Sequence, residues 1–490
     1  MIVEILGAKM LAPYIGTSHF VWTAQIAVTL VALATGYYLG GRLVDRSPRL
    51  ERLYWAIVLA AVYLAGTVPV VEPLAYWCLG FKLAVGSLLA SALLYFVPLA
   101  LLAMVGPFFV RSLTVAVGGV GGNVGRLTAI STLGSFAGTL LIGYVFIPLL
   151  RNSATMCLTT AALLAVSGGY FLGWGRKRAS PATLTGCLLA ALVLGAWGLK
   201  RDQPLRRADW QELCRANSNF GMIQVIDTRS GAFRFYLNDF LPQNGWDPKT
   251  RQSIFTFTYL LHGLASGYAP KIETVLVIGL GVGIVPMQFA REGARVDVVE
   301  INPAIVPIAR QYFGLETERL NLTLGDGRNF VNDCQKQYDA IVLDAFLGDS
   351  VPSHLMSRET FARIHGMLRP GGVLVINSFG GSYPGEGYLS ASLHKTLKAV
   401  FRSVRMHTAQ SGNVFFAASD QAEMQLRKVV APETVHESCR QQVLGALESV
   451  QSPPPDQGIV LTDDFNPADY FDAPNREQTR RQLVRSIHQQ

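Results

Sequence analysis

Long apolar segments fill the first 200 residues of this 490-residue chain, and shorter apolar runs alternate with polar stretches in the rest. A helix needs about 20 apolar residues to cross a bilayer. Six segments approach or exceed that length: 20–41, 53–71, 84–108, 127–150, 154–174 and 183–199. Residues 1–15 are expected to be the end of a further, partial helix. The pattern therefore predicts a multi-span α-helical transmembrane domain over residues 1–200.

In the second half, apolar and polar residues alternate over the shorter distances that are typical of an α/β domain. Residues 219–240 alternate like two strands around a turn at 228–231, which predicts a small β-hairpin region within 209–250. A helix is expected near 253–264, followed by the alternation of a doubly wound parallel sheet over 251–490. Strands are expected at 274–278, 295–299, 320–324, 339–343, 372–377, 402–407 and 414–418. The helices between them are expected at 284–292, 303–312, 354–367 and 389–400.

Composition narrows the classes of partner. The six cysteines form no CxxC pair, the eight histidines form no ligand cluster, and there is no P-loop motif. We therefore expect no metal and no disulfide framework. The net charge of +8 is compatible with nucleic acid, but many basic residues flank the apolar segments, where they orient helices. No nucleic-acid partner is expected.

A glycine-rich turn follows the strand at 274–278. Gly279, Gly281 and Gly283 lead into a helix, and the next strand ends on Glu300, 17 residues after the last of these glycines. Such a turn lets the backbone approach a ligand, and an acid at the end of the next strand can bind both ribose hydroxyls. This order of elements predicts a nucleoside-binding site.

Three acids stand at the carboxyl ends of successive predicted strands. They are Glu300, Asp326 and Asp344. In a parallel sheet these ends share one edge, where ligands bind. Glu300 is expected to hold the ribose, Asp326 in the Gly325–Gly327 turn to accept a hydrogen bond from an adenine amino group, and Asp344 to face the reacting end. An acid after a strand also commonly caps the next helix, but three in register favour a site.

Several motifs of the soluble half carry a resemblance to a known family. They are 237–243 (LNDFLPQ), 277–283, 299–302, 325–327, 338–344 and 461–464. Residues 219–470 resemble the spermidine synthase (polyamine aminopropyltransferase) family, whose fold is the Rossmann-like fold of the S-adenosylmethionine-dependent methyltransferases. Residues 4–13 and 36–45 resemble the bacterial membrane-fused spermidine synthase-like proteins.

The resemblance implies a co-substrate, a base and an acceptor. Gln243, the glycine turn, Glu300, Asp326 and the adjoining Gly327 would hold decarboxylated S-adenosylmethionine or S-adenosylmethionine. Asp344 would act as the base that deprotonates a small, putrescine-like amine, because an amine attacks the carbon next to a sulfonium only as its free base. The reaction would belong to polyamine biosynthesis and need no metal. Spermidine synthases commonly dimerise, so a homodimer is expected.

The acceptor half departs from the family pattern. The family's DxxDP-type motif is here Asp344-Ala-Phe-Leu, which lacks the second acid, and Asp349 is the next one along. The family's acceptor-binding tyrosine falls near Thr256, and Thr258 replaces an acid two residues further on. A dicationic amine would therefore meet a less acidic pocket than is usual in this family.

Three functions remain open on this pattern. The leading hypothesis is aminopropyl transfer, or a related cleavage of the nucleoside, with release of 5′-methylthioadenosine. The second is methyl transfer to an amine, lipid or quinone-like acceptor, with release of S-adenosylhomocysteine. The third is a non-enzymatic nucleoside sensor or transporter. Activity and ligand affinity of an Asp344→Asn variant separate the third from the other two.

The basic residues predict an orientation in the membrane. Arginines crowd 42–52, and basic residues crowd 176–178; the positive-inside rule puts both in the cytoplasm. A crossing at 183–199 then leads outward, whereas the basic stretch 200–207 favours the inside. Because the expected nucleoside is made in the cytoplasm, we expect a multi-pass protein of the cytoplasmic (inner) membrane with its soluble domain on the cytoplasmic face.

Overall fold

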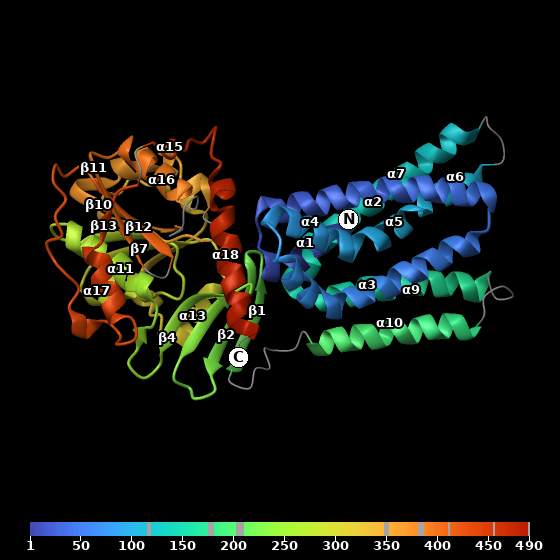
Figure 1. The fold of residues 1–490 in the computed structure, drawn as a ribbon, viewed down its shortest axis with the longest axis horizontal. Helices are drawn as coiled ribbons and strands as arrows, with labels where there is room; N and C mark the ends of the chain where they lie inside the picture. Colours follow the sequence, from blue (N-terminus) through green and yellow to red (C-terminus); the bar gives the residue numbers. More distant parts are fainter. Residues whose placement is uncertain are drawn as a thin grey trace. The chain divides into compact units, whose positions relative to one another are not determined.

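The computed structural model describes residues 1–114, 119–174, 181–201, 210–346, 352–380, 387–409, 412–453 and 456–488. The chain divides into two compact units (Figure 1). One contains Met1–Pro204 and Arg480–Gln490, and the other contains Leu205–Thr479. The basic residues 176–178, most of the stretch 200–207 and Asp349 lie outside the described residues.

The first unit is helical. After α1 (Ile2–Ile15), six helices of the described chain are long and apolar enough to cross a membrane, and each overlaps a predicted apolar segment. They span His19–Arg46, Leu50–Cys78, Leu83–Leu113, Val120–Leu149, Asn152–Gly173 and Ala182–Lys200. In element labels, they are α2 (His19–Arg46), α3 (Leu50–Cys78), α4 to α6 (Leu83–Ser91, Val97–Ala103, Val105–Leu113), α7 and α8 (Val120–Leu141, Ile147–Leu149), α9 (Asn152–Gly173) and α10 (Pro181–Arg201).

Two of these helices contain a π-helical turn. The turns are η1 (Ala92–Phe96) and η3 (Ile142–Phe146), and each ends two residues before a proline, Pro98 or Pro148. Proline has no backbone N–H and its ring crowds the preceding turn, so the regular hydrogen-bond ladder is interrupted there.

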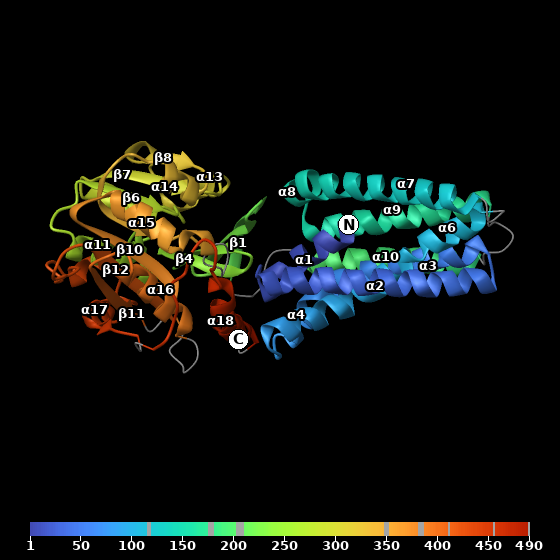
Figure 2. The same ribbon diagram turned by 90° about the horizontal axis from the view of Figure 1, so that it is seen from above.

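Small residues let these helices approach closely. A Cβ atom on Gly36 of α2 would lie 2.2 Å from the carbonyl oxygen of Ala100 in α5, and one on Gly198 of α10 would lie 2.5 Å from Val68 of α3. Helices α3, α9 and α10 also pack against one another, and they run side by side in Figures 1 and 2. Close packing of this kind is typical of helices that associate in lipid.

The second unit begins with a five-stranded antiparallel sheet, β1 to β5 in chain order. Its strands are β1 (Trp210–Ser218), β2 (Gly221–Thr228), β3 (Arg234–Asn238), β4 (Leu241–Asp247) and β5 (Gln252–Ser253). The predicted hairpin is β2 and β3. The sequence analysis missed β4 because its residues, LPQNGWD, are rich in turn formers and lack an apolar alternation.

A second sheet has eight strands in the order β13-β11-β12-β10-β9-β6-β7-β8. Its strands are β6 (Thr274–Ile278), β7 (Arg295–Glu300), β8 (Asn321–Leu324), β9 (Tyr338–Leu343), β10 (Leu368–Phe379), β11 (Ser403–Thr408), β12 (Asn413–Ser419) and β13 (Val450–Gln451). The five strands from β8 to β10 are parallel. This is the Rossmann-like arrangement of the methyltransferase type. The strand order reverses between β6 and β9, because β7 and β8 follow on one side of β6, and β9 and β10 lie on the other.

The last strands depart from a fully parallel sheet. β12 is antiparallel to both β10 and β11. Only residues 409–412 connect β11 to β12, and a parallel connection needs a dozen residues or more. The short connection therefore imposes the antiparallel pairing of β11 with β12.

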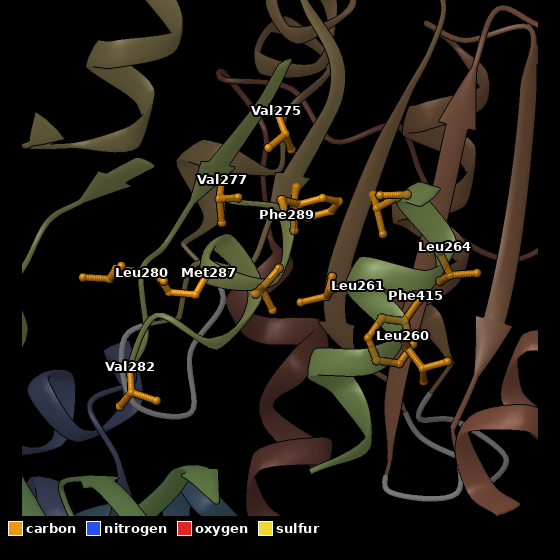
Figure 3. Close-up of a cluster of buried hydrophobic side chains, with 14 of the residues drawn as sticks. Leu260, Leu261, Leu264, Val275, Val277, Leu280, Val282, Met287, Phe289 and Phe415 are labelled. Atoms are coloured by element: carbon orange, nitrogen blue, oxygen red, sulfur yellow. The ribbon is translucent and has the colours of Figure 1, made fainter. Parts of the chain in front are cut away.

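Helices cover both faces of this sheet. Val275 and Val277 of β6 pack with α11 (Thr256–Tyr268), α12 (Ile284–Arg291), α13 (Ile305–Phe313) and α17 (Arg440–Glu448), and Figure 3 shows part of that core. Leu276 and Ile278 point to the opposite face, toward α14 (Gly327–Asp333), α15 (Arg358–Gly366) and α16 (Tyr388–Lys398). Burial of β6 on both faces explains its continuous apolar run.

Candidate active site

A cavity of about 480 Å³ opens at the carboxyl ends of the parallel strands. Loops that follow β6 and β9, where the strand order reverses, contribute to its wall, and such a switch point is where ligands bind in open α/β sheets. Seven of the eight predicted site residues line it: Gln243, Gly279, Gly281, Glu300, Asp326, Gly327 and Asp344. The eighth, Gly283, lines a separate cavity of about 60 Å³ instead.

The glycine turn is shaped by close contacts. Gly279, Gly281 and Gly283 all have positive φ, at 101°, 54° and 88°. A Cβ on Gly279 would lie 2.1 Å from the carbonyl oxygen of Asp344, so only glycine lets the turn pass the end of β9. A Cβ on Gly283 would lie 2.5 Å from Leu315, which gives this glycine a packing role at the start of α12.

Glu300 ties the glycine turn to the end of β7. Its Oε2 accepts a hydrogen bond of 2.8 Å from the N–H of Leu280, and its Oε1 accepts one of 2.7 Å from the N–H of Asn302. Burial raises the pKa of the carboxyl, and the backbone donors oppose that shift. Each oxygen can accept a second hydrogen bond. A carboxylate held in this way suits two neighbouring hydroxyl donors, such as those of a ribose.

Asp326 both lines the cavity and caps a helix. Its Oδ1 accepts a hydrogen bond of 3.0 Å from the N–H of Asn329 at the start of α14. The capping interpretation, which the sequence analysis disfavoured, therefore describes this residue. Its Oδ2 lies 3.3 Å from Nε2 of His354, which also lines the cavity. The sequence pattern did not single out His354, because its contact joins residues 28 apart in sequence.

Asp344 stands where β9 ends, beside the glycine turn. Its N–H donates to the carbonyl of Ile278 at 2.9 Å, and its Oδ1 accepts a hydrogen bond of 2.9 Å from Nδ2 of Asn377. Burial raises the pKa of Asp344 to about 6, and the bond from Asn377 acts in the opposite direction. A carboxylate with such a pKa can take up a proton near neutral pH.

Two asparagines that the sequence analysis missed complete this part of the wall. Asn377 and Asn413 both line the cavity, and Nδ2 of Asn413 donates to Oδ1 of Asn377 at 2.9 Å. Asn377 lies near the carboxyl end of β10, like the acids at the ends of the other strands, and could have been found by that signal. Asn413 begins an antiparallel strand, so no periodic pattern pointed to it.

Aromatic and amide groups line much of the remaining wall. Phe346 and Phe379 lie with ring centroids 4.9 Å apart, and Thr256 donates to Oε1 of Gln442 in α17 at 3.2 Å. Thr258 is buried and its hydroxyl donates to a backbone carbonyl, so it does not reach the cavity. The sequence lacks the acids that the family pattern has near Thr256 and Thr258, and the cavity wall near Thr256 is lined by neutral side chains.

The charged groups of the cavity are acidic. Among its described lining residues, the charged or titratable side chains are Tyr236, Glu300, Asp326, Asp344 and His354, and none is Lys or Arg. Within the described ranges, no three His, Cys, Asp or Glu side chains are grouped to hold a metal. The site is thus suited to a cationic ligand.

The fold is Rossmann-like, of the methyltransferase type, and the cavity lies where such folds bind their ligands. Residues 255–421 match the spermine/spermidine synthase domain, which indicates a transferase.

Relatives of known name include aminopropyltransferases and methyltransferases. The polyamine aminopropyltransferase of Vibrio vulnificus is 29% identical over 236 residues, which cover 45% of this chain and 77% of that protein. The N-terminal histidine N-methyltransferase of Emericella nidulans is 31% identical over 219 residues, which cover 40% of this chain and 38% of that protein. Putrescine N-methyltransferase 2 of Nicotiana attenuata is 32% identical over 133 residues, 26% of this chain and 36% of that protein.

Proposed function

We propose that this protein is a membrane-bound aminopropyltransferase. It uses decarboxylated S-adenosylmethionine as the donor and a small amine as the acceptor, and it releases 5′-methylthioadenosine. The observation that carries the proposal is the Asp344 carboxylate, which combines a pKa of about 6 with a position beside the glycine turn in an acidic cavity.

The proposed step needs a base and correct placement, and no metal takes part in it. The nitrogen lone pair of the acceptor attacks the aminopropyl carbon bonded to the sulfonium, and a C–N bond forms as the C–S bond breaks. The electron pair of that bond stays on sulfur, which leaves as the neutral thioether of 5′-methylthioadenosine. One N–H proton of the acceptor passes to Asp344. Holding donor and acceptor in line contributes much of the remaining rate.

The charge of the cavity favours the decarboxylated donor. That molecule carries two positive charges, on the sulfonium and on the amino group, and no carboxylate. Intact S-adenosylmethionine adds a carboxylate, which needs hydrogen-bond donors or a cation when it is removed from water. The described cavity wall offers three carboxylates and no Lys or Arg. The same charges also favour a cationic amine such as putrescine as acceptor.

In this proposal, Glu300 and Asp326 bind the decarboxylated S-adenosylmethionine. Glu300 accepts from the two ribose hydroxyls while its backbone bonds hold it in place. Asp326 accepts from the adenine amino group, and Gln243, Gly279, Gly281 and Gly327 shape the wall around the nucleoside.

The helical unit supports a location in a membrane. Its six apolar helices favour a multi-pass protein of the cytoplasmic membrane. We place the soluble unit on the cytoplasmic face, where the nucleoside donor is made. A reporter fused after Gln490 tests this placement, and activity of a reporter that works only in the periplasm would refute it.

Identification of the nucleoside product tests the proposed reaction. Purified full-length protein is incubated with S-adenosylmethionine or its decarboxylated form, each with and without putrescine. We expect 5′-methylthioadenosine only with the decarboxylated donor and an amine. An Asp344→Asn variant should bind the donor and form no product, whereas the exposed Asp333→Asn variant serves as the matched control. Release of 5′-methylthioadenosine without an acceptor would instead indicate cleavage of the nucleoside.

Methyl transfer to an amine is the second candidate. The observation in its favour is the similarity to two N-methyltransferases at 31% and 32% identity. In that case S-adenosylhomocysteine appears from S-adenosylmethionine in the same experiment, and the decarboxylated donor gives no transfer of its aminopropyl group.

A further inference from the structure

We propose that Asn377 and Asn413 form a positioning pair that reserves one oxygen of Asp344, Oδ2, for the proton of the acceptor amine. The inference rests on the proposed function, because it assigns the proton in that reaction. It adds two residues, one from strand β10 and one from strand β12, that act on the base through hydrogen bonds.

The geometry is a chain of two hydrogen bonds. Nδ2 of Asn413 donates to Oδ1 of Asn377 at 2.9 Å, and Nδ2 of Asn377 donates to Oδ1 of Asp344 at 2.9 Å. Asn377 pairs with Phe415 across the two strands and Phe379 pairs with Asn413, so the two asparagines are diagonal neighbours. Such diagonal pairs on one face of a sheet are within reach of each other.

The outer asparagine decides which way the inner amide points. An amide presents an NH₂ donor on one side and a carbonyl acceptor on the other, and the two ends have nearly the same shape. A carbonyl turned toward the Asp344 carboxylate would place two acceptors in contact. Because Asn413 donates to the carbonyl of Asn377, the NH₂ group of Asn377 is directed at Asp344. Asn377 is only 3% exposed, so water does not readily replace this partner.

The consequence for Asp344 is an asymmetric carboxylate. Oδ1 is occupied by the bond from Asn377, whereas Oδ2 has no hydrogen bond to any described residue. A proton taken from the acceptor therefore goes to Oδ2. The donor at Oδ1 favours the ionised form, since hydrogen bonds to a carboxylate stabilise its charge.

No other titratable side chain of the described cavity wall forms a hydrogen bond to Asp344. The other titratable groups that line the described wall are Tyr236 in β3, Glu300 at the end of β7, Asp326 after β8 and His354 in the 3₁₀ turn η5 (Ser353–Leu355). None of them is within hydrogen-bond distance of Asp344. The two influences on the pKa of Asp344 are burial, which raises it, and the Asn377 donor, which lowers it. Loss of that donor therefore raises the pH below which the base is protonated.

The test is the pH dependence of kcat for the full-length protein with decarboxylated S-adenosylmethionine and putrescine. In Asn377→Leu, we expect the acid limb to move up by about one pH unit, which is the size of one lost hydrogen bond to a charged group. The KM for the donor should stay within about twofold, because the pair acts on the base. Asn413→Leu should shift the limb in the same direction by less. The double variant should match Asn377→Leu, because Asn413 reaches Asp344 through Asn377.

A matched control separates this role from general damage. Nδ2 of the exposed Asn321 donates to Oδ1 of Asp297 at 2.9 Å, the same kind of bond outside the cavity, so Asn321→Leu should leave the limb unchanged. A merely structural role would lower kcat equally at every pH. An active wild type whose limb stays in place in both cavity variants overturns the inference alone. A wild type that forms neither nucleoside product overturns the proposed function and this inference with it.

Discussion

Replacing the proposed base should make the protein more stable while it removes activity. Burial raises the pKa of Asp344 from 3.8 to about 6, a difference of about 2 units, and each unit corresponds to about 1.4 kcal/mol. The ionised carboxylate therefore destabilises the folded state by up to about 3 kcal/mol above that pH. Because the side chain lies at a cavity wall that solvent reaches, we expect about 1–2 kcal/mol in practice. Asp344→Asn removes the charge and keeps an oxygen that accepts from Asn377.

The effect should depend on pH with a definite sign. A carboxyl whose pKa is higher in the folded state stabilises that state while it is protonated, and this contribution is lost as the pH rises through about 6. The gain from Asp344→Asn should therefore be complete above about pH 7 and vanish below about pH 4. With about 2–4 °C per kcal/mol for a domain of this size, the apparent melting temperature should rise by roughly 2–8 °C at pH 8.

Thermal unfolding of the full-length protein in detergent, at pH 8 and at the lowest pH where it stays folded, measures this difference. Asp333→Asn, on the exposed end of α14, is the matched control and should change the melting temperature little at either pH. A variant that is no more stable than the wild type at pH 8 would refute the argument that Asp344 is held ionised against its burial.

Further predictions concern the rest of the site and the helical unit. Activity should fall below about pH 6, as Asp344 becomes protonated, and a flat profile from pH 5 to 7 would contradict its role as base. Glu300→Gln should weaken donor binding about 10–100-fold by calorimetry, because an NH₂ group then faces backbone donors; unchanged affinity refutes this. Gly279→Ala should prevent folding of the site, whereas Gly293→Ala, also at positive φ but with free space, should cost about 1 kcal/mol; equal melting temperatures count against the clash. Gln25→Leu should not lower the melting temperature, because both amide atoms of Gln25 are buried without a hydrogen bond in the described chain; a loss of several degrees would reveal a partner.

Much of the fold could be predicted from local patterns in the sequence. The apolar segments correspond to the six long helices, and the strands and helices expected from 274 to 418 all have counterparts in the structure. A buried strand, a glycine turn and an amphipathic helix each leave a signal in neighbouring residues, so they can be read without knowledge of the rest of the chain. Strand β4, whose residues favour turns, left no such signal.

The sequence by itself determined where strands β6, β7 and β9 end and which residue follows or ends each of them. It therefore identified Gly279, Glu300 and Asp344 as cavity residues, because the carboxyl ends of parallel strands lie along one edge of a sheet. The tertiary structure alone decided which strands are neighbours. Placing β9 beside β6 brings Asp344 against the glycine turn, and the antiparallel pairing of β12 brings Asn413 to Asn377. Those pairings join segments far apart in the chain, and no local period records them.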